Sequence, residues 1–176
     1  MIRQVPNTQE VYISPTSGDS IIIEVLERVS QRDYAEAARS TIRPGARSKI
    51  FPLVLTCAFF RYHFEAIADD NDAVSFSVDE VNEISNTRGD GIPSIIVLSG
   101  RQGVRKFNRT SVDDVRIFLA LYRLMLEEKG VDLVLSLNFP MNTSEGVVRT
   151  EEFSAAKETF RSIATSFHII DLCLFA

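Results

Sequence analysis

The sequence predicts one globular domain that mixes helices and strands, in the α/β class and of the α+β type. The chain has 176 residues, of which 45% are hydrophobic and 24% charged, enough for a single well-formed core. Several short runs rich in β-branched residues are typical of strands, and one amphipathic stretch is typical of a helix. Because no repeat, low-complexity tract or domain boundary interrupts it, we expect a single domain over residues 1–176.

The N-terminal part predicts two strands followed by helical segments. Val11–Ile13 is short, β-branched and aromatic, and Ser20–Glu27 carries three consecutive isoleucines, as buried strands do. Residues 15–19 contain Pro, Ser and Gly, which favour a turn between these strands. Asp33–Arg39 and Tyr62–Ala68 are both expected to be helical.

The middle of the chain predicts three strands. Ala73–Val78 alternates apolar and polar residues, so its valines and phenylalanine are expected to face the core. Pro93–Leu98 and Val104–Phe107 are interpreted as two strands joined around Gly100–Gly103. This Gly-rich, basic stretch lacks the Gly-x-x-x-x-Gly-Lys-Ser/Thr spacing of a phosphate-binding loop, and we interpret it as a hairpin tip.

The segment Asp113–Lys129 is ambiguous by pattern. It contains strong helix formers and is followed by Gly130, a good helix C-cap. Its apolar residues also alternate with a period of two, which favours a strand, at Val115, Ile117, Leu119 and Leu121. Val131–Phe139 predicts a strand that ends at Pro140.

The C-terminal part predicts a helix and then a strand. Thr150–Ser166 is the helix, with Thr150 as its N-cap and Glu151 and Glu152 beside the positive end of the helix dipole. Its apolar face consists of Phe153, Ala156, Phe160, Ile163 and Ala164. Phe167–Phe175 is expected to close the chain as a strand.

Charge and composition favour a protein partner over nucleic acid or a membrane. Nineteen Lys and Arg against 24 Asp and Glu give a net charge of −5, whereas proteins that grip nucleic acid carry a basic excess. An acidic surface suits a basic protein partner. The longest apolar stretch, residues 50–60, contains Pro52 and is shorter than the roughly 20 residues that span a bilayer.

No pattern in the sequence indicates a catalytic, metal or cofactor site. Cys57 and Cys173 lie outside any Cys-x-x-Cys pair and are interpreted as small hydrophobic residues. A calcium loop counted from Asp69 fails because apolar residues occupy positions that need a ligand and a glycine. An enzyme site at His63 or His168, the only histidines, would require a deep pocket that holds a histidine beside a carboxylate.

Five stretches resemble the Ran guanine nucleotide release factor family, the Mog proteins. They are Arg3-Gln-Val-Pro-Asn-Thr-Gln-Glu-Val-Tyr12, Ser20-Ile-Ile-Ile-Glu-Val-Leu-Glu27, Tyr62-His-Phe-Glu-Ala-Ile-Ala-Asp-Asp-Asn-Asp72, Val131-Asp-Leu-Val-Leu-Ser-Leu-Asn-Phe-Pro140 and Phe167-His-Ile-Ile-Asp-Leu-Cys-Leu-Phe175. Their order along the chain matches that of the family, and together they cover most of the sequence outside residues 40–61.

The resemblance implies a Mog/PsbP-like fold, a single antiparallel sheet with helices on both faces. It resolves the ambiguity at Asp113–Lys129 in favour of a strand paired with Val131–Phe139, with local helix propensity overridden by burial. It also implies a monomer without a cofactor, in the nucleus and cytoplasm, that binds the small GTPase Ran and promotes nucleotide release. A scaffold or assembly factor that uses the same fold without a GTPase is the alternative.

The family's Pro-Asp-x-Gln-Glu motif places the expected partner-binding residues. Its Glu corresponds to Glu10, and its Asp position is Asn7 here, which loses a charge and with it the strength of a charge-assisted hydrogen bond. Pro6-Asn7-Thr8 also has the composition of a simple turn into the strand, and both roles are compatible. The remaining expected binding residues are Gln9, Arg3, Asp69 and Asp70.

Two departures from the family pattern concern the N-terminus and residues 40–61. The family carries a further segment before the Arg-Gln-Val-Pro stretch, so the resemblance implies a missing N-terminal strand and an unpaired sheet edge. Residues 40–61 are interpreted as an insertion, with four basic residues and no acidic ones. We hypothesise that it is a translated short intron flanked by Arg39 and Arg61; genomic sequence without GT and AG there would exclude this. The alternative is a genuine loop insertion whose apolar segment packs on the domain.

Overall fold

The computed structural model describes residues 8–28, 51–87, 94–105, 111–126, 129–142 and 146–170, without the side chains of 51–60, 125, 126 and 129. In this part of the chain the strands form one antiparallel sheet of six, in the order β1-β2-β6-β5-β4-β3. The elements are β1 (Gln9–Ile13), β2 (Ser20–Glu27), α2 (Phe51–Asp70), β3 (Ala73–Ile84), β4 (Ile95–Val104), β5 (Asp113–Leu126), β6 (Lys129–Pro140) and α3 (Thr150–Ser166).

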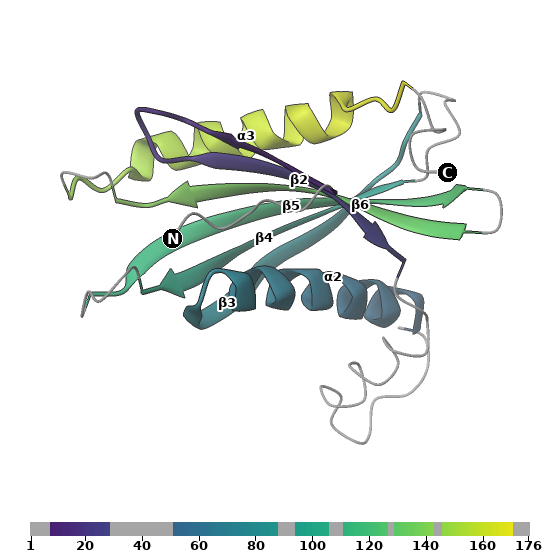
Figure 1. Cartoon of the computed structure of the whole chain (residues 1–176), viewed down its shortest axis with the longest axis horizontal. Coiled ribbons are helices and arrows are strands. Elements are labelled where there is room, and N and C mark those ends of the chain that lie inside the picture. The colour runs from purple at the N-terminus through teal and green to yellow at the C-terminus, as the bar shows by residue number, and fades with distance from the viewer. Residues whose placement is uncertain are drawn as a thin grey trace, which may run out of the picture.

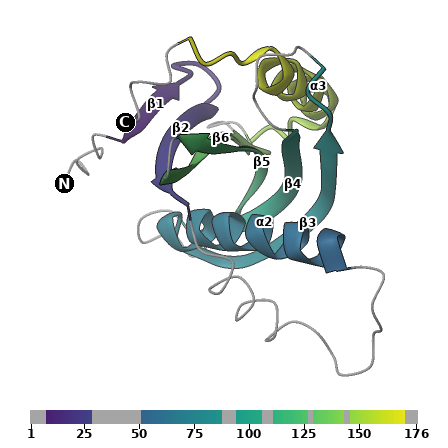
Figure 2. The same ribbon diagram turned by 90° about the vertical axis from the view of Figure 1, so that its right-hand side faces the viewer.

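The sheet lies between the two described helices, with α3 on one face and α2 on the other (Figures 1 and 2). On the α3 side, Phe160 and Ala164 are buried against β5 and β6, and apolar residues of β2 pack beside them. On the α2 side, Phe64 is fully buried against β4 and β5. One sheet with a helix on each face is the architecture that the family resemblance implied, and this expectation is confirmed.

Strand β5 resolves the ambiguous segment, because both of its faces are buried. Its odd-numbered residues, such as Ile117 and Leu119, join the α2-side core, and Phe118 and Tyr122 join the α3-side core. A helix with one apolar stripe could not bury both sets, so the central place in the sheet overrides local helix propensity. β5 pairs with β6 from Val115↔Pro140 to Leu126↔Lys129, as the resemblance implied.

The two strands predicted around Gly100–Gly103 are a single strand, β4, so the interpretation as a hairpin tip was wrong. Gly100 lies inside the sheet, opposite Val78 of β3 and Ile117 of β5. A Cβ atom at this position would lie 2.6 Å from the carbonyl oxygen of Ser77 and 2.7 Å from Cζ of Phe64. The glycine is therefore required by the close approach of α2 to the sheet, not by a turn.

The burial predicted for the apolar residues in the first part of β3 was also wrong. Val74, Phe76 and Val78 are 51%, 41% and 39% exposed. β3 is the outer strand of the sheet and has register shifts on either side of this segment, so few neighbours cover it. Phe76 still meets Phe64 of α2 edge to face, at 6.0 Å between ring centroids. The residues of β2 are mostly half-buried, not fully buried as the isoleucine run suggested.

Helix α3 has the predicted bounds and apolar face, but not the predicted cap. Arg149 occupies the N-cap position, with no side-chain capping hydrogen bond, and Thr150 is the first helical residue. The strand predicted from Phe167 does not form at residues 167–170, and 171–175 lie outside the described residues. The ring of Phe167 instead packs on Tyr122, 5.3 Å between centroids, so the chain lies over the sheet.

Helix α2 contains the predicted helical segment Tyr62–Ala68 and extends it toward the N-terminus, starting at Phe51. The helix predicted at Asp33–Arg39 and residues 40–50 lie outside the described part, as do Cys173 and the side chain of Cys57. The interpretation of residues 40–61 as an insertion therefore stays a prediction. Neither described helix has the combined length and apolar character needed to cross a membrane.

Candidate functional site at the β1 edge

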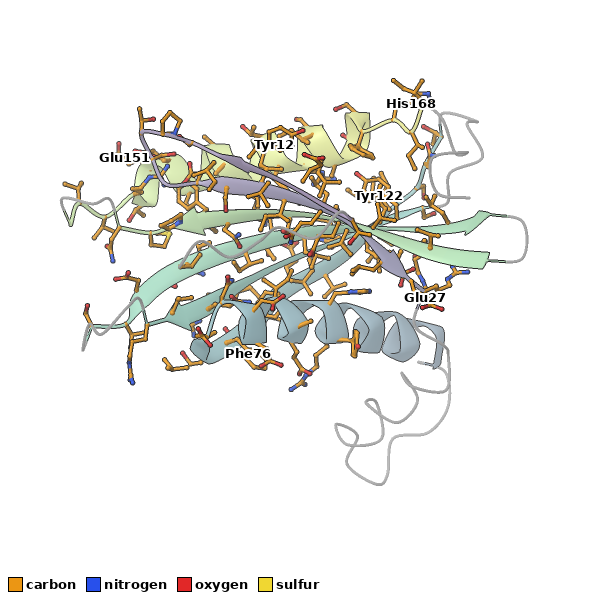
Figure 3. All side chains as sticks on the ribbon, in the orientation of Figure 1. Tyr12, Glu27, Phe76, Tyr122, Glu151 and His168 are labelled. Carbon is orange, nitrogen blue, oxygen red and sulfur yellow. The ribbon has the colours of Figure 1, made fainter. Side chains whose placement is uncertain are left out.

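Glu10 lies exposed on β1, at one edge of the sheet. It stands opposite Ile23 of β2, whose side chain packs into the α3-side core. Successive side chains of a strand point to opposite faces, so Glu10 and Tyr12 share the α3 side. Figure 3 shows Tyr12 on this side, and it is 59% exposed. Glu10 is therefore accessible to a partner that approaches this edge.

Gln9 points to the opposite face and is held by β2. It pairs with Glu24 across the two strands, and its amide Nε2 donates a hydrogen bond of 2.6 Å to Oε1 of Glu24. The backbone N–H of Val25 donates to the carbonyl oxygen of Thr8 at 2.9 Å. These two contacts attach the start of β1 to β2.

Glu24 is a half-buried carboxylate that the sequence did not single out. Burial is the main reason that its pKa is raised, and the charge of Asp70 adds to the effect, while the hydrogen bond from Gln9 and the charge of His63 oppose it. Gln9 and Asp70 thus both act on Glu24, on the α2 side. The signal in the sequence was an acidic residue inside the apolar run Ile21-Ile-Ile-Glu-Val-Leu26.

Asp69 and Asp70 are exposed at the last turn of α2. Acidic residues there add to the negative end of the helix dipole, and no basic residue lies in that turn. The side chain of Asn71 donates to Oε1 of Gln102 on β4 at 2.8 Å, which fixes this helix end. These acids accompany Gln9 on the α2 side, whereas Glu10 lies on the α3 side. Arg3 and Asn7 are outside the described residues.

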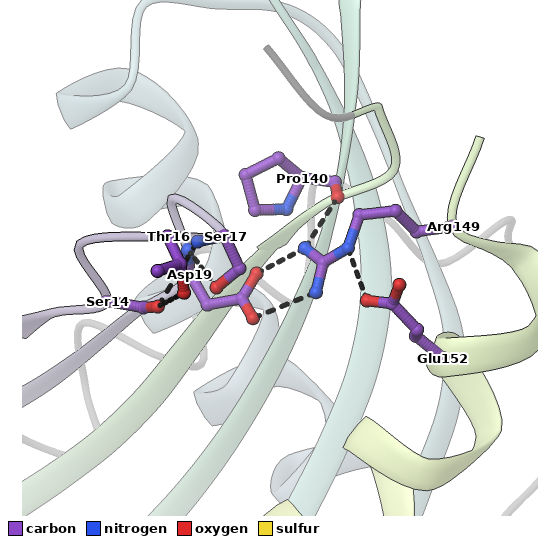
Figure 4. A network of polar contacts seen from close by, with 7 residues as sticks. All are labelled: Ser14, Thr16, Ser17, Asp19, Pro140, Arg149 and Glu152. Atoms are coloured by element: carbon purple, nitrogen blue, oxygen red, sulfur yellow. Dashed lines mark hydrogen bonds and ion pairs between the residues drawn. The ribbon is translucent and has the colours of Figure 1, made fainter. Parts of the chain in front are cut away.

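The other end of the β1–β2 hairpin is anchored to α3 by Arg149 (Figure 4). Its guanidinium contacts both carboxylate oxygens of Asp19, one at 3.0 Å, and also binds Glu152 at 2.6 Å and the carbonyl oxygen of Pro140. Its hydrogen bonds to Asp19 raise the pKa of Arg149 further above its ordinary value. A bidentate contact of this kind fixes orientation, so the hairpin turn has a defined place beside α3.

His63 does lie beside a carboxylate, but the pair is closed off from solvent. Its Nε2 is 3.4 Å from Oδ2 of Asp132, and the two residues are 3% and 0% exposed. Arg123 and Arg28 approach the other carboxylate oxygen at 3.2 and 3.8 Å. Burial alone would raise the pKa of Asp132, but His63 and Arg123 lower it below its ordinary value. This cluster ties α2 to β5 and β6, and both side chains of the pair are buried.

His168, by contrast, is exposed (Figure 3). Among the described residues, no group of three or more His, Cys, Asp or Glu side chains is arranged to hold a metal ion. The edge strand β1, by contrast, presents the exposed carboxylate of Glu10, which is suited to contact a basic surface.

Comparison with known proteins identifies the family. Residues 1–140 match the family described as "Ran-interacting Mog1 protein". The chain belongs to the Mog1 family. A Ran guanine nucleotide release factor from Danio rerio is 28% identical over 183 residues, which cover 99% of this chain and 87% of that protein. The nuclear import protein mog1 of Schizosaccharomyces pombe is 25% identical over 197 residues, which cover 100% of the chain and 89% of the relative.

The Mog1 fold is also found by structural comparison. The crystal structure of the Ran-binding protein Mog1p from Saccharomyces cerevisiae superposes with a TM-score of 0.57 at 21% sequence identity. The match covers 99% of this chain and 86% of that chain. At this identity the likeness establishes the fold, which agrees with the antiparallel sheet flanked by α2 and α3 described above.

Proposed function

We propose that this Mog1-family protein binds the small GTPase Ran and promotes release of its guanine nucleotide, as a component of nuclear protein transport. The observation that carries the proposal is Glu10, the acid of the family motif, exposed on an edge strand of a Mog1 fold. Relatives along nearly the whole chain are named Ran guanine nucleotide release factor or nuclear import protein. These names favour Ran over an unrelated scaffold role.

The binding surface is centred on the β1 edge. Glu10 contacts a basic patch of Ran from the α3 side, and Asn7 offers a hydrogen bond where the family motif has a carboxylate. Gln9 and Arg3 have lesser roles in this proposal, and Asp69 and Asp70 add negative potential on the α2 side. Replacement of the motif's Asp by Asn7 predicts weaker binding than a relative that keeps both acids.

Nucleotide release follows from differential affinity, without a covalent step by this protein. A protein that binds nucleotide-free Ran more tightly than loaded Ran must weaken nucleotide binding by the same factor, because the two equilibria are linked. No cofactor takes part in this mechanism. The protein acts as a monomer that meets Ran in the nucleus and the cytoplasm.

The proposal is tested by the charge reversal Glu10→Arg. We expect Ran binding to weaken at least about tenfold, because a cation would face the basic patch, with little change in thermal stability at this exposed site. Binding to nucleotide-free Ran is measured by calorimetry, and release of a fluorescent guanine nucleotide from Ran is measured in parallel. Glu27→Arg is the matched control, since Glu27 is an exposed acid at the C-terminal end of β2 that pairs with Val131 of β6 and has no partner residue in β1.

The outcomes separate the alternatives. Binding by the wild type that is lost in Glu10→Arg and kept in Glu27→Arg supports the β1 surface. Equal binding by all three proteins would remove Glu10 from the interface. If the wild type neither binds nucleotide-free Ran nor accelerates release, the scaffold alternative takes the place of the proposed function.

A further inference from the structure

We infer that Glu24 is a positioning residue: its hydrogen bond to Gln9 holds the register of β1 and so presents Glu10 to the partner. This inference rests on the proposed function and adds a residue that touches neither the partner nor the solvent-facing side of β1. Its basis is the cross-strand pair of Gln9 and Glu24, with 2.6 Å between Nε2 and Oε1.

Burial of apolar side chains does little to fix the register of β1 relative to β2. The strand has only five residues, and it is the outer strand at its edge of the described sheet. Val11 is half-buried, while Tyr12 and Ile13 are 59% and 68% exposed. A slip of one residue would therefore lose little buried apolar surface, yet it would move Glu10 from the α3 side to the α2 side.

The hydrogen bond between Gln9 and Glu24 fixes the register of β1 relative to β2 near the start of the strand. The bond can form only when Gln9 faces the α2 side, and Glu10 then faces the α3 side. An ionised carboxylate only accepts hydrogen bonds, so it can be satisfied by the N–H₂ of Gln9 and not by its carbonyl oxygen. Within the described residues, Gln9 is the one hydrogen-bond donor to the Glu24 side chain.

Stability alone does not explain a carboxylate at this place. Burial raises the pKa of Glu24, so its ionised form is disfavoured in the folded protein. The neighbouring charge of Asp70 raises this pKa further. Removal of the charge with the acceptor oxygen kept, as in Glu24→Gln, is therefore not expected to lower thermal stability at neutral pH. A variant that loses binding without losing stability separates a positioning role from a merely structural one.

The test measures partner binding for Glu24→Ala, Gln9→Ala and the double variant. Each single change is expected to weaken binding about fivefold, the effect of one lost hydrogen bond. The double variant is expected to weaken binding by about the same fivefold and not by about 25-fold, because both changes remove one interaction. Glu24→Gln keeps an acceptor oxygen and should stay within about twofold of the wild type. Glu27→Ala, on the same strand, is the control for loss of an acidic residue.

Hydrogen exchange of the Val25 amide in the free protein supplies a second readout. This amide donates to the carbonyl oxygen of Thr8, at the start of β1. Its exchange should become faster in Glu24→Ala and Gln9→Ala, and stay unchanged in Glu24→Gln and Glu27→Ala. Thermal midpoints of all variants check that each protein remains folded.

Three outcomes would overturn the inference. These are unchanged binding in Glu24→Ala, losses that multiply in the double variant, and weaker binding with an unchanged Val25 exchange rate. The last result would mean that Gln9 contacts the partner directly, without help from β1 register. Because wild type and Glu10→Arg are measured in the same series, absence of Ran binding by the wild type would instead count against the proposed function.

Discussion

At the scale of single residues, Asp132 is a buried carboxylate that joins α2 to the sheet. It is fully buried, and its carboxylate contacts His63 of α2 and the guanidinium groups of Arg28 and Arg123. We expect Asp132→Asn to lower the free energy of unfolding by about 2–3 kcal/mol at neutral pH, since an amide cannot balance these donors. Urea unfolding of both proteins measures the difference.

The same change has a defined pH dependence. The folded-state pKa of Asp132 lies below its ordinary value of 3.8, so the carboxylate contributes stability above that pH. This contribution is lost as the pH falls through the folded-state pKa. The stability gap between wild type and Asp132→Asn should therefore narrow on acidification below about pH 4. A gap that stays constant down to about pH 3 would contradict the assigned charge interactions.

Single residues also show where sequence reasoning about the site reached its limit. Glu10 was found through a motif, and the structure places it exposed on the edge strand. Glu24 was not found, because its role depends on the register between β1 and β2, which brings it opposite Gln9. The pair of His63 and Asp132, 69 positions apart, was equally invisible, because no local spacing encodes a contact across layers.

At the scale of elements, the packing of α2 on the sheet depends on a glycine. Gly100→Ala would place a methyl group against Ser77 and the ring of Phe64, both closer than 3 Å. We expect a loss of about 1–3 kcal/mol in unfolding free energy, because backbone on one side and a buried ring on the other leave little room. Thermal unfolding measures it, and a variant as stable as the wild type would show that α2 can shift outward.

Gly18→Ala is the matched comparison for this prediction. At Gly18 nothing lies within 4 Å of an added Cβ, but the backbone has φ +73°, a conformation that favours glycine. The expected cost there, about 1 kcal/mol, comes from backbone conformation and not from packing. The two variants thus separate steric from conformational reasons for a glycine, a distinction that the sequence pattern of β4 did not reveal.

Elements with a strong local pattern were predictable, and those governed by neighbours were not. α3 carries its own apolar face and charged first turn, so its bounds could be predicted. The residue pattern of β5 fits a helix as well as a strand. It forms a strand because it lies in the centre of the sheet, between β4 and β6. The sequence pattern predicts two strands in place of β4 because glycines such as Gly100 and Gly103 are typical of turns, whereas here they are required by close neighbours in other elements.

At the scale of the whole molecule, the net charge of −5 bears on how the partner is reached. Acids near the β1 edge and at the end of α2 give this region a negative potential, and a basic partner surface is attracted to it before contact. Potentials of exposed charges are screened within about 8 Å at physiological ionic strength. Association, more than dissociation, should therefore respond to salt.

We expect the association rate constant with Ran to fall about tenfold between ionic strengths of about 0.05 and 0.5 M, with a much smaller change in the dissociation rate constant. Stopped-flow mixing over a salt series measures both. Glu10→Arg should show a shallower salt dependence, because it removes one favourable charge and adds an unfavourable one at the contact. Glu24→Ala should act differently: if Glu24 holds β1 in register in the free protein, fewer molecules present Glu10 correctly, so association becomes slower while its salt dependence stays close to that of the wild type. An association rate indifferent to salt would mean that apolar contacts govern the encounter, and the acidic β1 surface would lose its assigned role.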